Sequence, residues 1–84
     1  MDKPIDWLYG YFSEKGTLPG ASKDEQLRAD YFDAGLIDSF GVIDLITSIE
    51  SQFKVELKPD NMQDIRFRTV KGLAEIIEEN REGS

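Results

Sequence analysis

The side chains that could do chemistry in this chain are few, because it contains neither histidine nor cysteine. Histidine is the commonest general base, and cysteine is the strongest side-chain nucleophile. Without cysteine, disulfides and thiolate zinc sites are also excluded. If the chain handles acyl chemistry, we expect its reactive group to come from elsewhere. The pair Asp38-Ser39 stands out, since both residue types can cap a helix by accepting a hydrogen bond from an unpaired N–H group.

Four helices are predicted to position this pair. The second helix is the clearest, because apolar residues recur along it at the spacing of one helical stripe. Proline can start a helix and glycine can end one, which sets several of the other boundaries. The fold class is therefore all-α, a four-helix bundle with a long loop after the first helix and a short third helix. The expected helices run from Pro4 to Lys15, from Ser39 to about Lys54, from Pro59 to about Ile65, and from after Thr69 into a fraying segment at Glu78–Glu82.

The core is expected to come from apolar stripes on the three longer helices, with the loop of residues 17–37 held against it. Within that loop, Ser22 and Glu25 have the spacing of a capping box, which predicts a short turn of helix. Four apolar loop residues could attach the loop to the body of the protein. The expected core and loop residues are Ile5, Leu8 and Phe12, with Trp7 and Tyr11 beside them; Leu27, Tyr31, Phe32 and Leu36; Val42, Leu45, Ile46, Ile49 and Phe53; and Val70, Leu73, Ala74 and Ile77.

The 84 residues make one domain, with an ordered part at about residues 4–80 and a polar tail at 81–84. The formal net charge of -7 would repel phosphate backbones, so nucleic acid is not expected as a partner, and a basic surface on another protein is. No apolar run is long enough to span a membrane, and no signal peptide is recognised. These features predict a cytoplasmic protein that does not insert into membranes.

Phe40 does not fit the core stripe of its helix. On a helical wheel it lies about 160° from that stripe, and Ile43 lies about 100° away. Together with the methyl group of Thr47 they would form an apolar patch bordered by the acids Asp38, Asp44 and Glu50, unless the long loop covers Phe40. An apolar patch with a charged rim is typical of a docking surface. A helix N-terminus also favours a negative group, so a phosphate ester on Ser39 would be stabilised there.

Asp38-Ser39-Phe40 at a helix start, after Gly35-Leu36 and before an apolar helix that ends in Phe53, resembles the acyl carrier protein family. Members of that family have Asp-Ser-Leu at this place. The resemblance extends over nearly the whole chain, including its length, its acidity, the order of its helices and a last helix that starts at Thr69-Val70. It implies that a phosphopantetheinyl transferase moves 4′-phosphopantetheine from coenzyme A onto Ser39. The thiol of that arm would carry an acyl or aminoacyl group as a thioester, and the carrier itself would catalyse nothing.

The resemblance also implies where partners and cargo are met. Partner enzymes such as acyl or aminoacyl ligases, synthases and transferases, with basic docking patches, would contact the second and third helices of a monomeric carrier. An acyl chain, where it is sheltered, would lie between the helices. By position, the partner residues are Asp38, Phe40, Ile43, Asp44, Thr47, Glu50, Leu57 and Ile65, and the acyl pocket would be lined by Ile46, Ile49, Met62 and Ile65.

Departures from the family pattern indicate a specialised carrier. Phe40 replaces a leucine, and Gly41 and Ser51 stand where fatty-acid carriers usually have acids. Glycine costs about 1 kcal/mol of helix propensity against alanine, so a contact at Gly41 is expected to need its small size. The stretch Arg66–Ala74 is closer to D-alanyl and peptidyl carriers. The cargo therefore remains open between acyl groups of fatty-acid, polyketide or other specialised lipid synthesis and D-alanyl or other aminoacyl groups.

Three other classes of protein fit the sequence less well. A calcium-binding EF-hand fails, because loops counted from Asp33 or from Asp38 place apolar residues at ligand positions. A small enzyme would need a base for Ser39, and only a carboxylate such as Asp38 is present. A helical interaction module without a prosthetic group, in which Ser39 is only a cap, remains the remote alternative.

Overall fold

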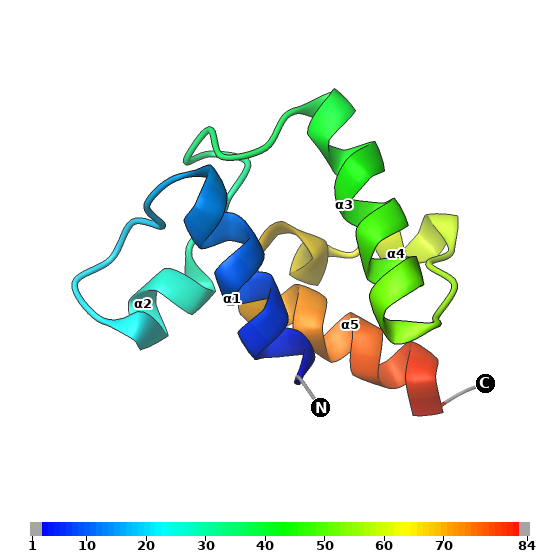
Figure 1. Cartoon of the computed structure of the whole chain (residues 1–84). Helices are drawn as coiled ribbons and strands as arrows, with labels where there is room; N and C mark the ends of the chain where they lie inside the picture. The colour runs from blue at the N-terminus through cyan, green and yellow to red at the C-terminus, as the bar shows by residue number, and fades with distance from the viewer. Residues whose placement is uncertain (1–2, 83–84) are drawn as a thin grey trace.

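The computed structural model describes residues 3–82, and these form a helical protein (Figure 1). The predicted all-α class is confirmed, with one 3₁₀ helix and one additional short helix. No helix within residues 3–82 has the length and apolar character needed to cross a membrane. The elements in chain order are α1 (Pro4–Lys15), α2 (Lys23–Arg28), α3 (Ser39–Phe53), α4 (Pro59–Gln63), η1 (Ile65–Arg68) and α5 (Val70–Glu82).

The helix boundaries follow local chemistry. Pro4 opens α1, and Lys54 ends α3 in a left-handed conformation with φ 56°. Ser22 Oγ accepts a hydrogen bond from the N–H of Glu25, so the predicted turn of helix in the loop exists as α2. The hydroxyl of Thr69 accepts a hydrogen bond from the N–H of Gly72 at 3.0 Å and begins α5 as expected.

Two boundaries differ from those predicted. The third helix ends at Gln63, and Asp64 then caps the separate helix η1 by accepting the N–H of Arg66 at 2.9 Å. The last helix runs to Glu82 and does not fray at Glu78. Its end is supported by Arg66, whose guanidinium bonds Glu79 at 2.6 Å. Residues 81 and 82 of the predicted polar tail therefore belong to α5, and residues 83 and 84 lie outside the described part of the chain.

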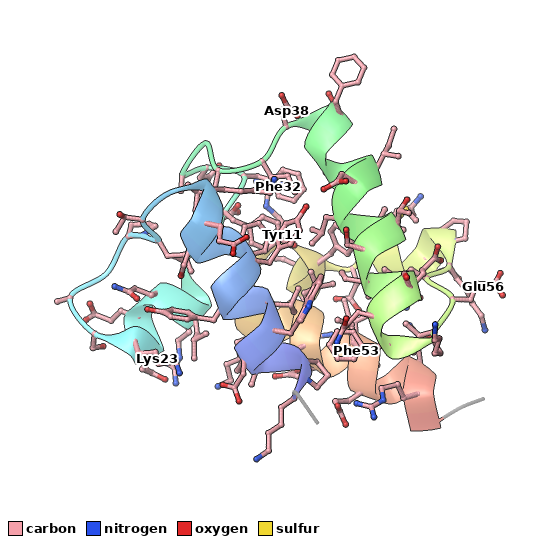
Figure 2. All side chains as sticks on the ribbon, viewed as in Figure 1. Tyr11, Lys23, Phe32, Asp38, Phe53 and Glu56 are labelled. Atoms are coloured by element: carbon pink, nitrogen blue, oxygen red, sulfur yellow. The ribbon has the colours of Figure 1, made fainter. Side chains whose placement is uncertain are left out.

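The core lies where the apolar faces of α1, α3 and α5 meet. Fully buried positions include Leu8 and Phe12 of α1, Leu45 and Ile49 of α3, and Leu73 of α5. Side chains of Tyr11 and Phe53 fill the space between α1 and α3 in Figure 2. The connection between α1 and α3 joins this core as predicted. Tyr31 is fully buried, and Leu27 of α2 packs against the core together with Phe32 and Leu36 of the loop that follows.

The loop is also fastened by polar contacts to η1. The backbone N–H of Tyr31 donates to the carbonyl of Arg68 at 3.1 Å, and the Tyr31 hydroxyl donates to the carbonyl of Phe67. Arg68 Nε donates to Asp30 at 2.5 Å. These bonds fix the residues that lead into α3. The start of α3 lies at one end of the molecule, and the start of α1 and the end of α5 lie at the other (Figure 1).

Candidate functional site

Asp38 and Ser39 have separate roles at the start of α3. Asp38 is the N-cap, and its Oδ1 accepts a hydrogen bond from the N–H of Gly41 at 2.7 Å. Ser39 follows as the first helical residue and is exposed. Figure 2 shows Asp38 at the exposed end of α3. Because Asp38 provides the cap, the Ser39 hydroxyl is not needed for it and faces solvent.

Ile37 and Gly41 hold this end of the helix in place. Ile37 is 7% exposed, so it anchors the chain in the core directly before the cap. A Cβ atom on Gly41 would lie 2.8 Å from Cγ1 of Ile37 and 3.3 Å from Oδ1 of Asp38. The absence of a side chain at Gly41 therefore allows both the anchor and the cap. This contact explains why a residue of low helix propensity stands in the first turn of α3.

The apolar patch predicted on α3 is exposed. Phe40 is 82% exposed and Ile43 is 65% exposed, so the long loop does not cover them. Thr47 is also exposed, and its hydroxyl donates to the carbonyl of Ile43 at 2.9 Å. Ile65 of η1 is 81% exposed. Such large apolar side chains in solvent are typical of surfaces that other proteins cover.

Two of the acids predicted to border the patch, Asp44 and Glu50, accept hydrogen bonds from other parts of the chain. Asp44 accepts a hydrogen bond from the Tyr11 hydroxyl at 2.7 Å, which joins α3 to α1. Burial and this bond to Asp44 raise the pKa of Tyr11. Glu50 accepts the backbone N–H of Leu57 at 3.0 Å. Leu57 is 5% exposed and belongs to the core, so it is not available to a partner, contrary to what the family resemblance implies.

The four residues expected to line an acyl pocket do not share one environment. Ile49 is fully buried in the core, whereas Ile65 is mostly in solvent and Met62 is 40% exposed. Ile46 is half-buried. A side chain as exposed as Ile65 cannot wall an enclosed chamber, so these residues do not form the expected pocket in this structure.

The start of α3 meets the requirements of a phosphate ester on a serine. The hydroxyl of Ser39 is exposed, and the first turn that follows it has the residues Phe40, Gly41 and Val42, none of them acidic. The N-terminal N–H groups of a 15-residue helix favour a negative group at this position. The residues present therefore fit the prosthetic group that the sequence resemblance implies.

Sequence reasoning missed two contributors to this site. Ile37 was not identified as an anchor, although an apolar residue just before a helix cap is a known signal for such packing. The bond between Tyr11 and Asp44 joins residues 33 positions apart, and no local pattern signals it. Both contributors determine how α3 is held while its first turn stays exposed.

Comparisons with known proteins agree with this geometry. The family model of the phosphopantetheine attachment site matches residues 17–77. D-alanyl carrier proteins of Streptococcus pyogenes serotypes M5, M49 and M1 are each 33% identical over 55 residues, which cover 66% of this chain and 70% of each relative. No solved structure gave a significant match. With most of its length matched by that family model, the chain belongs to the phosphopantetheine attachment-site family of acyl carrier proteins.

Proposed function

We propose that Ser39 is the residue to which 4′-phosphopantetheine is attached. One observation supports this proposal most strongly. Asp38 caps the start of α3, and the hydroxyl of Ser39 therefore stays exposed. In forming the ester, the Ser39 oxygen would lose its proton and bond to the phosphorus of the phosphopantetheine group. The pyrophosphate bond of coenzyme A would break at that phosphorus, and adenosine 3′,5′-bisphosphate would leave. The chain has no histidine, and Asp38 Oδ1 already accepts the N–H of Gly41, so we expect the transferase to supply the base that accepts this proton, as the family resemblance implies.

The protein is a carrier and not an enzyme. The prosthetic group of its family supplies a terminal thiol, which the chain itself lacks because it has no cysteine. The role of the chain's own residues is to present that group. Ile37 and Asp38 fix the start of α3, and the exposed Phe40 beside Ser39 gives a partner an apolar side chain to bind.

The partner surface is proposed to centre on Phe40, Ile43 and Ile65, whose side chains are exposed. Asp38, Asp44, Thr47 and Glu50 would contribute less, because their polar atoms already bond within the chain. Partners would therefore include a phosphopantetheinyl transferase and ligases or transferases with an apolar recess for Phe40. We expect the carrier to act as a cytoplasmic monomer, since it must present one surface to successive enzymes.

A short acyl or aminoacyl cargo is favoured over a long fatty acyl chain. The relatives reported above are named D-alanyl carrier proteins, and they give no support to fatty-acid synthesis in particular. The side chains of Ile49 and Ile65, one in the core and one in solvent, also do not shelter a long chain between them. A D-alanyl or similar aminoacyl group needs no such shelter.

Mass spectrometry tests the attachment to Ser39. The chain is co-expressed with a phosphopantetheinyl transferase of broad specificity, and we expect a mass gain of one phosphopantetheine group. Ser39→Ala should abolish the gain, while Ser48→Ala, a change on the same helix, should leave it intact. Unmodified wild-type protein with several such transferases, or modification that persists in Ser39→Ala, would show that the proposal is wrong.

A further inference from the structure

A hollow of about 390 Å³ lies on α1, away from the serine that starts α3. It is lined by Asp6, Trp7, Gly10, Tyr11 and Glu14. Residues 6, 10 and 14 are four apart, and residues 7 and 11 lie beside them, so the lining forms a strip along one face of a single helix. Gly10 forms the middle of the strip, with a carboxylate toward each end.

No contact within residues 3–82 explains why position 10 is a glycine. Gly10 stands in the interior of α1, where glycine is less favourable than any residue except proline. A Cβ atom built on Gly10 meets no heavy atom within 4 Å. By contrast, a Cβ atom on Gly41 would press on Ile37, and one on Gly72 would collide with the backbone of Arg66. A glycine that no described neighbour requires is explained when another molecule approaches the backbone closely at that point.

The strip suits a cation that is also planar. The rings of Trp7 and Tyr11 are stacked with their centres 5.4 Å apart, and the ammonium group of Lys15 lies 4.8 Å from the centre of the Tyr11 ring. A cation of the chain itself, Lys15, thus already binds to the aromatic wall formed by Trp7 and Tyr11. Asp6 forms an exposed ion pair with Lys23 at 3.8 Å, a kind of contact that a second cation can replace. Aromatic faces next to carboxylates favour a guanidinium group, which stacks and forms ion pairs at once.

We propose that this hollow receives an arginine side chain of a partner enzyme. The guanidinium would lie over Gly10 between the carboxylates of Asp6 and Glu14, against the wall formed by Trp7 and Tyr11. The net charge of -7 supports a basic partner. Tyr11 also bonds Asp44 of α3 at 2.7 Å, so one partner can contact α1 and α3 together. The inference rests on the carrier function only for the existence of partner enzymes, not on modification of Ser39.

The test uses the full unmodified chain and a defined probe. The peptide acetyl-Ala-Arg-Ala-amide is titrated into ¹⁵N-labelled protein, and its citrulline isostere, which has the same shape without the charge, serves as the matched ligand. We expect saturable shifts at the amide of Gly10 and the indole N–H of Trp7 with the arginine peptide, at least threefold weaker with the citrulline peptide. Raised salt should weaken the arginine titration.

Three variants make the result specific. Gly10→Ala should weaken binding of the arginine peptide at least threefold while the melting temperature stays equal or rises, because alanine favours the helix and meets no neighbour. Glu14→Gln should also weaken binding. Glu56→Gln removes an equal charge on the side of the molecule away from α1 (Figure 2) and should leave binding unchanged.

The proposal is overturned if no saturable shift occurs up to the solubility limit of the peptide, or if the two peptides bind equally. It is also overturned if Glu56→Gln weakens binding as much as Glu14→Gln, which would mean attraction to the net charge alone. Because Ser39→Ala should bind the arginine peptide like the wild type, failure here is distinct from failure of the mass-spectrometric test of attachment.

Discussion

At the scale of single residues, two apolar side chains on either side of the cap of α3 have opposite surroundings. Ile37 is 7% exposed and Phe40 is 82% exposed, although only the cap and the serine separate them. The buried residue fixes the helix start, and the exposed one is free to meet another protein. A change at Phe40 should therefore affect partners and spare the fold.

We expect Phe40→Ala to change the free energy of unfolding by less than about 0.5 kcal/mol, the usual range for surface positions. Modification or loading by a partner enzyme should slow about tenfold or more, since a well-buried interface aromatic is worth over 1 kcal/mol. Urea unfolding and initial rates measure the two effects.

Leu45→Ala is the matched control for this test. Its side chain is fully buried on the same helix, so it should cost about 2–5 kcal/mol of stability. If Phe40→Ala behaved like Leu45→Ala and lost stability on that scale, Phe40 would be a core residue and the docking surface would have to be sought elsewhere.

At the scale of elements, three carboxylates hold the loop and the two last elements together. Hydrogen bonds from Arg66 lower the pKa of Asp64 and of Glu79. Partial burial acts to raise the pKa of Asp30, but hydrogen bonds from Arg68 and from two backbone N–H groups outweigh it and lower the pKa. Each carboxylate is therefore easier to protonate in the unfolded chain than in the folded one.

This difference predicts loss of stability in acid. Groups with depressed pKa values in the folded state stabilise it fully above their unfolded values of 3.8 for aspartate and 4.5 for glutamate, and the stabilisation is lost as pH falls through the lower folded values. Urea unfolding from pH 7 to pH 2.5 should show the decline beginning near pH 4. Arg66→Gln should flatten the profile, while Arg28→Gln on α2 should not. A profile unchanged by Arg66→Gln would contradict the assignment.

Helices with a clear repeat of apolar residues could be predicted from the sequence. Helix boundaries that depend on contacts between residues far apart in the chain could not. The stripe of α3 and the cap at Thr69 are local signals, and both agree with the structure. The end of α5 was placed too early, because its polar composition suggests fraying while Arg66, far back in the chain, bonds Glu79.

The same limit applies to the candidate site. Exposure of Phe40 followed from its angle on the helical wheel, since α3 has one clear apolar face. The burial of Leu57 could not be predicted from the sequence, because Leu57 lies in a connection that has no repeat of apolar residues. The carboxylate of Glu50, which accepts its N–H, is seven residues away. Family position alone had assigned Leu57 to the surface.

At the scale of the whole molecule, the residues expected to line an acyl pocket are divided between the core and the surface, which limits what the carrier can shelter. Six CH₂ groups of an octanoyl chain would add roughly 5 kcal/mol if they were buried. We expect no such gain, so octanoyl and D-alanyl forms of the carrier should melt within about 4 °C of each other, the shift that roughly 1 kcal/mol produces in a domain of this size. Differential scanning calorimetry of the two loaded proteins decides the matter, and an octanoyl form that melts tens of degrees higher would reveal a sheltering pocket.

The start of α1 and the end of α5 lie at the end of the molecule opposite the start of α3 (Figure 1). A chain immobilised on a solid support through either end would therefore hold Ser39 out toward the liquid. Enzymes passed over such a support in succession could each reach the same serine, and the product of every step could be washed, weighed and passed on without the carrier ever being released.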